Sequence, residues 1–130
     1  MKIHHIGYLV KNMKKSLEEF LKLGYLVEGD IINDDIRQIS IVFLIKDRYR
    51  IELVSPQDRG SATGDLLKKI GNSPYHICYE VPCLDEAIVE FEKNGYLLTI
   101  EPQIAPAINN KRVAFLYNMH LGMIEILEVY

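Results

Sequence analysis

Two six-residue stretches, HIGYLV at residues 5–10 and HICYEV at residues 76–81, decide the fold of this chain. Sliding the sequence by 71 positions superposes the first stretch on the second, and the match continues without a gap. The residues that recur at this offset are Glu19, Phe20, Lys22, Gly24, Tyr25 and Leu26, which return as Glu90, Phe91, Lys93, Gly95, Tyr96 and Leu97. Further on, small differences in loop length shift the offset to 72 and then to 73, so that Phe43-Leu44 returns as Phe115-Leu116 and Ile51-Glu52-Leu53 returns as Ile124-Glu125-Ile126. The chain is therefore an internal duplication.

Each half predicts the same order of elements: a strand, a helix and three further strands. A β-branched, alternating segment opens each half, and apolar residues at helical spacing follow it up to a glycine. The helix faces are Met13, Leu17, Phe20 and Leu21 before Gly24, and Leu84, Ile88 and Phe91 before Gly95. The predicted strands are residues 3–10, 25–32, 38–45 and 49–54, then residues 75–81, 96–104, 112–117 and 123–129.

Length and composition indicate one compact domain with no charged polymer as its partner. The chain has 130 residues, 48% of them hydrophobic, and 15 basic against 18 acidic residues. The charges are nearly balanced and no run of basic residues occurs, so the sequence excludes nucleic acid as a partner. The sequence offers no apolar stretch long enough for a membrane span and no signal peptide, so we expect a cytoplasmic protein without a membrane partner. Cys78 and Cys83 are expected to be reduced and structural.

The repeat selects four residues as candidate metal ligands. Side chains alternate across a strand, so His5 and His76 lie near the start of equivalent strands on the face away from the helices, and Glu52 and Glu125 occupy equivalent positions on the last strands. Two imidazoles and two carboxylates suit one divalent ion such as Zn, Ni, Co, Mn or Fe. A single strand histidine is more often a packing residue, but here the pair is kept in both halves. His4 has no such support, because its counterpart is Tyr75.

The expected fold class is α+β, with two tandem βαβββ modules that form an open, U-shaped mixed sheet around the metal site. A single domain would span residues 1–130, with module one over about residues 1–60 and module two over residues 74–130. Residues 61–73 would form a connector, in which a short helix over residues 63–70 ends at Gly71.

These motifs resemble a known superfamily over essentially the whole chain. The repeated His-Ile-x-Tyr, the Ile-Glu-Leu and Ile-Glu-Ile segments, and Arg-Val-Ala-Phe-Leu at residues 112–116 are similar to the vicinal oxygen chelate superfamily, which contains glyoxalases, bleomycin resistance proteins and dioxygenases. Within it, the pattern is most similar to the methylmalonyl-CoA epimerase family and next to glyoxalase I. The resemblance implies that one chain supplies all four ligands, His5, Glu52, His76 and Glu125, and that the protein is a homodimer.

The resemblance also implies a metal-dependent isomerase or lyase that acts on a small acyl thioester or hemithioacetal. The metal would act as a Lewis acid on a carbonyl oxygen, while Glu125 and Glu52 serve as ligands that also move the α-proton. Lys111 and Arg112 are candidates for binding a phosphate or carboxylate of the substrate. The sequence does not name the carrier, which is CoA for an epimerase and glutathione for a lactoylglutathione lyase.

Two other readings stay open, and one departure bears on them. A binding protein of the bleomycin-resistance kind shares the fold without needing four matched ligands, whereas dioxygenases and fosfomycin-modifying enzymes resemble a three-ligand pattern that Glu52 argues against. A relative that keeps the metal but takes another acyl substrate is the remaining alternative. It is favoured by residues 105–110, Ala-Pro-Ala-Ile-Asn-Asn, which replace the glycine-rich segment expected there.

Overall fold

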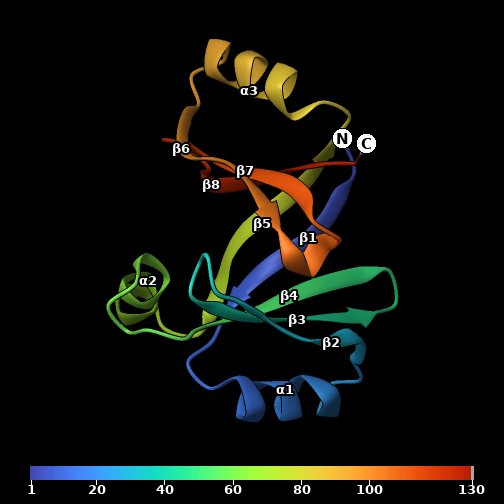
Figure 1. Ribbon diagram of the computed structural model, residues 1–130. Coiled ribbons are helices and arrows are strands. Elements are labelled where there is room, and N and C mark those ends of the chain that lie inside the picture. Colours follow the sequence, from blue (N-terminus) through green and yellow to red (C-terminus); the bar gives the residue numbers. More distant parts are fainter. Residues whose placement is uncertain (130) are drawn as a thin grey trace. The chain divides into compact units, whose positions relative to one another are not determined.

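The computed structural model describes residues 1–129 and shows the βαβββ order twice (Figure 1). The first module contains β1 (Ile3–Leu9), α1 (Met13–Lys22), β2 (Leu26–Asp34), β3 (Ile39–Lys46) and β4 (Tyr49–Pro56). Helix α2 (Ala62–Ile70) follows. The second module contains β5 (Ser73–Val81), α3 (Leu84–Lys93), β6 (Leu97–Ala105), the short 3₁₀ helix η1 (Pro106–Ile108), β7 (Lys111–Asn118) and β8 (Gly122–Glu128). The predicted α+β class and the tandem modules are confirmed.

The chain divides into two compact units whose boundaries do not coincide with the ends of the modules. One unit is Ile6–Tyr75, and the other combines Met1–His5 with the chain from His76 onward. Strand β1 therefore contributes its first three residues to one unit and its last four to the other. The chain passes from one unit to the other after His5 and again before His76, the two histidines that the sequence predicts as metal ligands.

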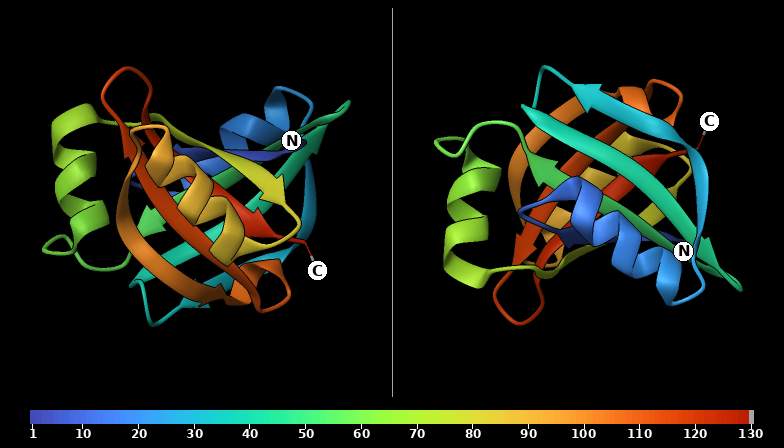
Figure 2. Two further views of the ribbon diagram at one scale, coloured as in Figure 1. Left: turned by 90° about the horizontal axis from the view of Figure 1, so that it is seen from above. Right: turned by 90° about the horizontal axis from the view of Figure 1, so that it is seen from below.

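In the unit Ile6–Tyr75, the strands lie in the order β2-β3-β4-β1. β4 is antiparallel to β3 and parallel to β1, and Glu52 on β4 is in register with Gly7 on one side and Phe43 on the other. Helix α1 lies across these strands (Figure 2). Its apolar face packs on one cluster, made of Val10, Val42, Leu44, Ile51 and Leu53 with Tyr8, Met13, Leu17, Phe20 and Tyr25.

In the other unit, the order β5-β8-β7-β6 repeats that arrangement. Glu125 on β8 is in register with Cys78 of the parallel β5 and with Phe115 of the antiparallel β7. Cys78 and Phe115 are the repeat counterparts of Gly7 and Phe43, so the two modules agree in strand register as well as in element order. Helix α3 packs on its own strands through Leu84, Ile88 and Phe91.

The ends of α1 follow from local chemistry. Asn12 precedes the helix and its side chain accepts a hydrogen bond from the Lys15 amide at 3.0 Å, which satisfies one free donor of the first turn. Gly24 has φ +97°, a conformation that glycine adopts without a steric penalty, and it ends the helix as predicted. Leu21 is 43% exposed, so its predicted place on the buried face of α1 is wrong.

Residues 105–110, which replace the expected glycine-rich segment, form a compact turn between β6 and β7. Pro106–Ile108 make one turn of 3₁₀ helix, in which Ile108 is buried, and Asn109 and Asn110 follow with φ values of +54° and +58°. Asparagine is one of the few residues that tolerate this left-handed region. The chain thus reverses here without a glycine. Among residues 1–129, no helix combines the length and hydrophobicity needed to cross a bilayer.

Helix α3 receives its N-terminal cap from a distant strand. Cys83 precedes the helix but makes no side-chain capping bond. Instead, the Glu128 carboxylate of β8 accepts a hydrogen bond from the Leu84 amide at 2.7 Å, and Arg112 binds the same carboxylate at 3.0 Å. The bond from Arg112, together with the bond from Leu84, lowers the pKa of Glu128 below its usual value. An ionised carboxylate is thus held at the positive end of the helix dipole.

We expect Glu128→Ala to lower the free energy of unfolding by about 1 kcal/mol at neutral pH, the usual effect of losing a helix cap at a solvent-accessible site. A carboxyl whose pKa is depressed in the folded state stabilises above its unfolded pKa and loses that effect as the pH falls through the folded value. Urea unfolding should therefore show a smaller difference at pH 3 than at pH 7. Glu101→Ala, at an exposed carboxylate of β6, is the control. An equal difference at both pH values would contradict this role.

Candidate metal centre

Three of the four predicted ligands come together in one compact unit. His5 lies on β1, His76 on β5 and Glu125 on β8, and all three belong to the unit formed by Met1–His5 and the chain from His76 onward. Their exposed fractions are 1%, 4% and 1%. A carboxylate removed from water to this degree needs compensating partners.

The partners of Glu125 are the two imidazoles. Its Oε1 atom lies 3.0 Å from Nε2 of His5 and 3.1 Å from Nε2 of His76, and the two Nε2 atoms are 3.2 Å apart. Although these distances are short, Oε1 accepts no well-directed hydrogen bond from the described residues. The three donor atoms therefore form a nearly equilateral triangle.

This triangle fits a bound cation. In octahedral coordination, ligand atoms held at about 2.1 Å from a common divalent ion lie at right angles to one another and therefore about 3.0 Å apart. The nitrogen and carboxylate donors are the types that borderline ions such as Zn, Ni, Co, Mn and Fe accept. The residues present therefore fit the metal that the sequence predicts.

The protonation state of Glu125 agrees with such a role. Burial alone raises the pKa of this carboxyl, but its contacts with His5 and then His76 outweigh burial and hold the pKa well below the ordinary value. Glu125 is therefore a carboxylate at neutral pH. An ionised oxygen beside two imidazole nitrogens is the form that binds a cation.

The rings around the triangle pack edge to face. The centroids of His5 and His76 are 5.4 Å apart with an interplanar angle of 76°, and His76 meets Phe115 at 5.3 Å and 89°. Phe115 is the register partner of Glu125 and is itself buried. This packing restricts the rotamers of the ligands, which pre-orients their donor atoms.

His4 is a residue that the repeat did not select but that contacts the site directly. Its Nδ1 atom lies 2.8 Å from Nδ1 of His5. If Nε2 of His5 binds a metal, its proton must reside on Nδ1, so His5 donates and His4 accepts. Such second-layer partners fix the tautomer and the ring orientation of metal-binding histidines. Cys78 is buried nearby, and its sulfur lies within 4.8 Å of ring nitrogens of His4 and His5.

The fourth predicted ligand, Glu52, lies in the other compact unit, Ile6–Tyr75. It is 4% exposed, and its place between Gly7 and Phe43 matches that of Glu125 between Cys78 and Phe115. Its participation in the metal site stays a prediction.

The basic residues predicted to bind substrate stand at the start of β7. Arg112 donates to Glu128 at 3.0 Å and to Asp85 at 3.4 Å, and these bonds raise its pKa above the usual value. Arg112 thus has a structural task in the cap of α3. Substrate binding by Lys111 and Arg112 stays a prediction.

The paired βαβββ modules and the buried cluster of His5, His76 and Glu125 are typical of one class of proteins. The chain belongs to the glyoxalase/bleomycin resistance protein/dioxygenase superfamily, whose family model matches residues 2–115. This finding confirms the resemblance recognised in the sequence. No curated protein matches the chain.

Solved structures with the same fold include methylmalonyl-CoA epimerases. Hypothetical protein BH1468 from Bacillus halodurans C-125 is 27% identical, with a TM-score of 0.87 over 99% of this chain and 94% of that one. Methylmalonyl-CoA epimerase from Mycobacterium tuberculosis is 23% identical, with a TM-score of 0.84 over 97% and 86%. A variant of the Streptomyces coelicolor epimerase in complex with 2-nitronate-propionyl-CoA is 21% identical, with a TM-score of 0.86 over 98% and 94%. Likenesses below 25% identity establish the fold alone. The homodimer and the cytoplasmic location stay predictions.

Proposed function

We propose that this protein is a metal-dependent isomerase of the methylmalonyl-CoA epimerase type, which removes and returns the proton on a carbon next to a thioester carbonyl. The observation that carries the proposal is the triangle of buried donor atoms from His5, His76 and Glu125. A protein that only sequesters a ligand has no need of an ionised carboxylate buried between two imidazoles, because such a group is costly without a cation.

We include Glu52 as the fourth ligand. Its support is the duplication, because Glu52 and Glu125 stand at the same register position of equivalent strands and are both buried. Two carboxylates related in this way suit a reaction at a planar carbon, where one base takes a proton from one face and the other returns a proton to the opposite face.

A divalent ion held by these four residues would supply Lewis-acid stabilisation of the negative charge that develops on the carbonyl oxygen. The residues of the chain perform the remaining steps. Glu125, ionised at neutral pH, takes the proton from the α-carbon and afterwards releases it to solvent. Glu52 delivers a proton to the other face and regains one from solvent. The buried ring of Phe115 packs edge to face against His76 at 5.3 Å, so this side of the site is apolar.

The acyl-CoA substrate class is favoured by the structural neighbours. One of them is a methylmalonyl-CoA epimerase in complex with methylmalonyl-CoA and NH4+, which is 20% identical, with a TM-score of 0.85 over 98% of this chain and 93% of that one. The bound thioester belongs to that protein, and it supports a thioester as the proposed substrate of this chain. A hemithioacetal is the alternative, because the same bases move a proton between adjacent carbons.

Deuterium incorporation tests the proposal. Metal-loaded protein in deuterated buffer should exchange the α-proton of at least one member of a panel of 2-methyl-branched acyl-CoAs, as followed by NMR or mass spectrometry. Methylglyoxal with glutathione belongs to the same panel, and turnover of that substrate alone would replace the epimerase proposal with a glyoxalase. Stoichiometric metal without exchange on any substrate, at protein concentrations that bind each compound, would contradict both.

A further inference from the structure

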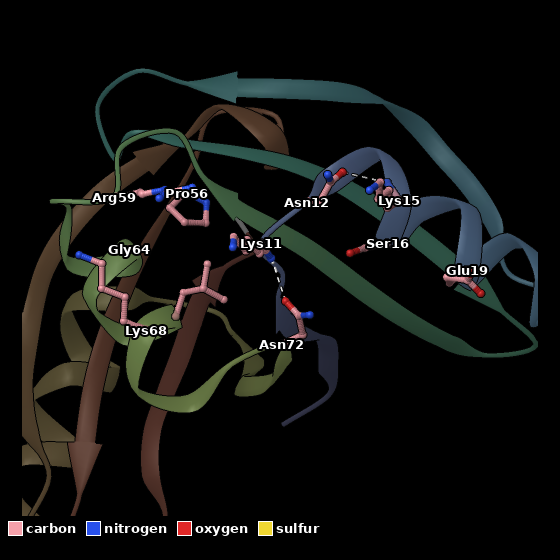
Figure 3. Close-up of a pocket in the computed structure, with 11 residues that line it drawn as sticks. Lys11, Asn12, Lys15, Ser16, Glu19, Pro56, Arg59, Gly64, Lys68 and Asn72 are labelled. Atoms are coloured by element: carbon pink, nitrogen blue, oxygen red, sulfur yellow. Dashed lines mark hydrogen bonds between the residues drawn. The ribbon is translucent and has the colours of Figure 1, made fainter.

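A cavity that none of the predicted metal ligands lines belongs wholly to the unit Ile6–Tyr75. It has a volume of about 760 Å³ and is lined by residues of α1 and the two positions before it, the end of β4, the loop after β4, helix α2 and the position before β5 (Figure 3). This volume falls within the range of small-molecule sites. Most of the residues that line it are polar or charged, whereas gaps in a core are lined by apolar groups.

Four cations surround this cavity: Lys11, Lys15, Arg59 and Lys68. Within residues 1–129, none of their side chains forms an ion pair or a hydrogen bond. The one carboxylate in the lining, Glu19, is bound by Lys22 at 3.1 Å. Four like charges around one space repel one another, so the cavity carries an uncompensated positive potential that an anion would relieve.

The backbone adds to this potential. Asn12 and Lys15 belong to the beginning of α1, and Gly64 belongs to the first turn of α2, so the positive ends of two helix dipoles border the cavity. Gly64 is required for this arrangement, because a Cβ atom there would lie 2.6 Å from the carbonyl oxygen of Arg59. The close approach fixes the loop that carries Arg59 against α2.

The second module provides an internal control for the fold. A cavity at the equivalent place is lined by Pro82, Cys83, Glu86, Ala87 and Glu90, which are the repeat counterparts of Lys11, Asn12, Lys15, Ser16 and Glu19. There the cations are absent and a carboxylate takes the place of Lys15. The βαβββ module therefore does not need Lys11 and Lys15 at this position, and Arg59 and Lys68 lie outside the repeated module.

We propose that this cavity binds a phosphate-bearing small molecule. The negative charge that the cations bind belongs to a pyrophosphate or nucleotide group of that molecule. Four cations around about 760 Å³ exceed the need of a single carboxylate and suit two or more phosphate charges. The phosphates can come from a free nucleotide or from the CoA carrier of a thioester. This inference is independent of the proposed reaction, since it uses none of the metal ligands.

Calorimetric titration of full-length protein with inorganic pyrophosphate tests the proposal. The variant that carries Lys15→Glu and Lys68→Glu should bind pyrophosphate at least about tenfold more weakly than wild type, because two favourable charge contacts become repulsive. The matched control carries Lys14→Glu and Lys69→Glu, at exposed lysines adjacent in sequence that do not line the cavity. It has the same net charge and should stay within about twofold of wild type. Circular dichroism verifies the fold of both variants.

ADP and CoA, titrated in separate experiments on metal-free protein, distinguish the two sources. Tighter binding of CoA than of ADP, lost in the cavity variant, would assign the site to the carrier of the substrate. Equal or tighter binding of ADP would assign it to a free nucleotide. Equal weakening in the cavity variant and its control would overturn the proposal, because it would show only an effect of net charge. Absence of pyrophosphate binding by wild type at about 10 mM would overturn it as well.

Discussion

His76→Ala should lower the affinity of the protein for its divalent metal by at least about a hundredfold, since it removes one of three convergent donors. Glu125 cannot replace the missing imidazole as a ligand, because its carboxylate already occupies one corner of the triangle. Competition with a chelator of known affinity, carried out with Zn, Ni, Co and Mn in turn, measures the loss. The metal content of the purified protein gives an independent reading.

The other histidines make this measurement specific. His4→Ala should weaken metal binding by about tenfold, because it removes the acceptor at 2.8 Å that orients His5 while leaving the ligand in place. His120, an exposed histidine on the β7–β8 turn, serves as the control, and His120→Ala should bind metal as wild type does. Equal affinity of wild type and His76→Ala for every ion would show that the triangle is not a metal site.

Glu125→Gln should reduce α-proton exchange of the epimer whose proton Glu125 removes by at least about a hundredfold, even when the variant is saturated with metal. The amide keeps an oxygen that can bind a cation but has no lone pair basic enough to take a proton from carbon, and a general base contributes about 10²–10⁴ in rate. The measurement is deuterium incorporation under metal-saturating conditions, checked by metal analysis of the same sample. Glu101→Gln, at an exposed carboxylate, is the matched control.

Stereochemically defined substrate sharpens this experiment. If Glu125 and Glu52 act on opposite faces, Glu125→Gln should lose exchange from one epimer and Glu52→Gln from the other, while racemisation fails in both. Full retention of exchange by Glu125→Gln on every accepted substrate would remove this residue from the chemistry. It would not by itself remove it from the metal site, which the chelator competition measures separately.

The duplication made much of this molecule predictable. Because Phe43 and Glu52 recur as Phe115 and Glu125, the sequence predicts equal strand registers in the two halves, and the observed pairs agree. Alternation along a strand then separates His5 from Tyr8, which packs under α1 as part of the core. Strand ends were less predictable, and β4 runs on to Pro56, because backbone pairing with Ile39 continues past the last apolar residue.

What escaped prediction depends on contacts between residues distant in the sequence. The cap of α3 joins the Leu84 amide to Glu128, which lies 44 residues further along the chain, and no local sequence motif predicts this contact. The repeat does not select His4 as part of the metal site, because its counterpart is Tyr75. The contact of His4 with His5 depends on ring geometry that only the structure reveals. The basic cavity gathers Lys11, Arg59 and Lys68 from three separate segments, each of which resembles an ordinary solvated surface in the sequence.

The division of β1 between two units has a mechanical consequence. His5 is the last residue of the N-terminal segment that belongs with the second module, and His76 is the first residue after the unit Ile6–Tyr75. A cation bound by both histidines would connect the residues that flank the two ends of that unit, and so would close a loop of chain that contains the whole unit. Closing a long loop removes more freedom from the unfolded chain than closing a short one. The ion would therefore act as a cross-link that secures the N-terminal segment, so the first event of unfolding after metal removal should be the release of Met1–His5.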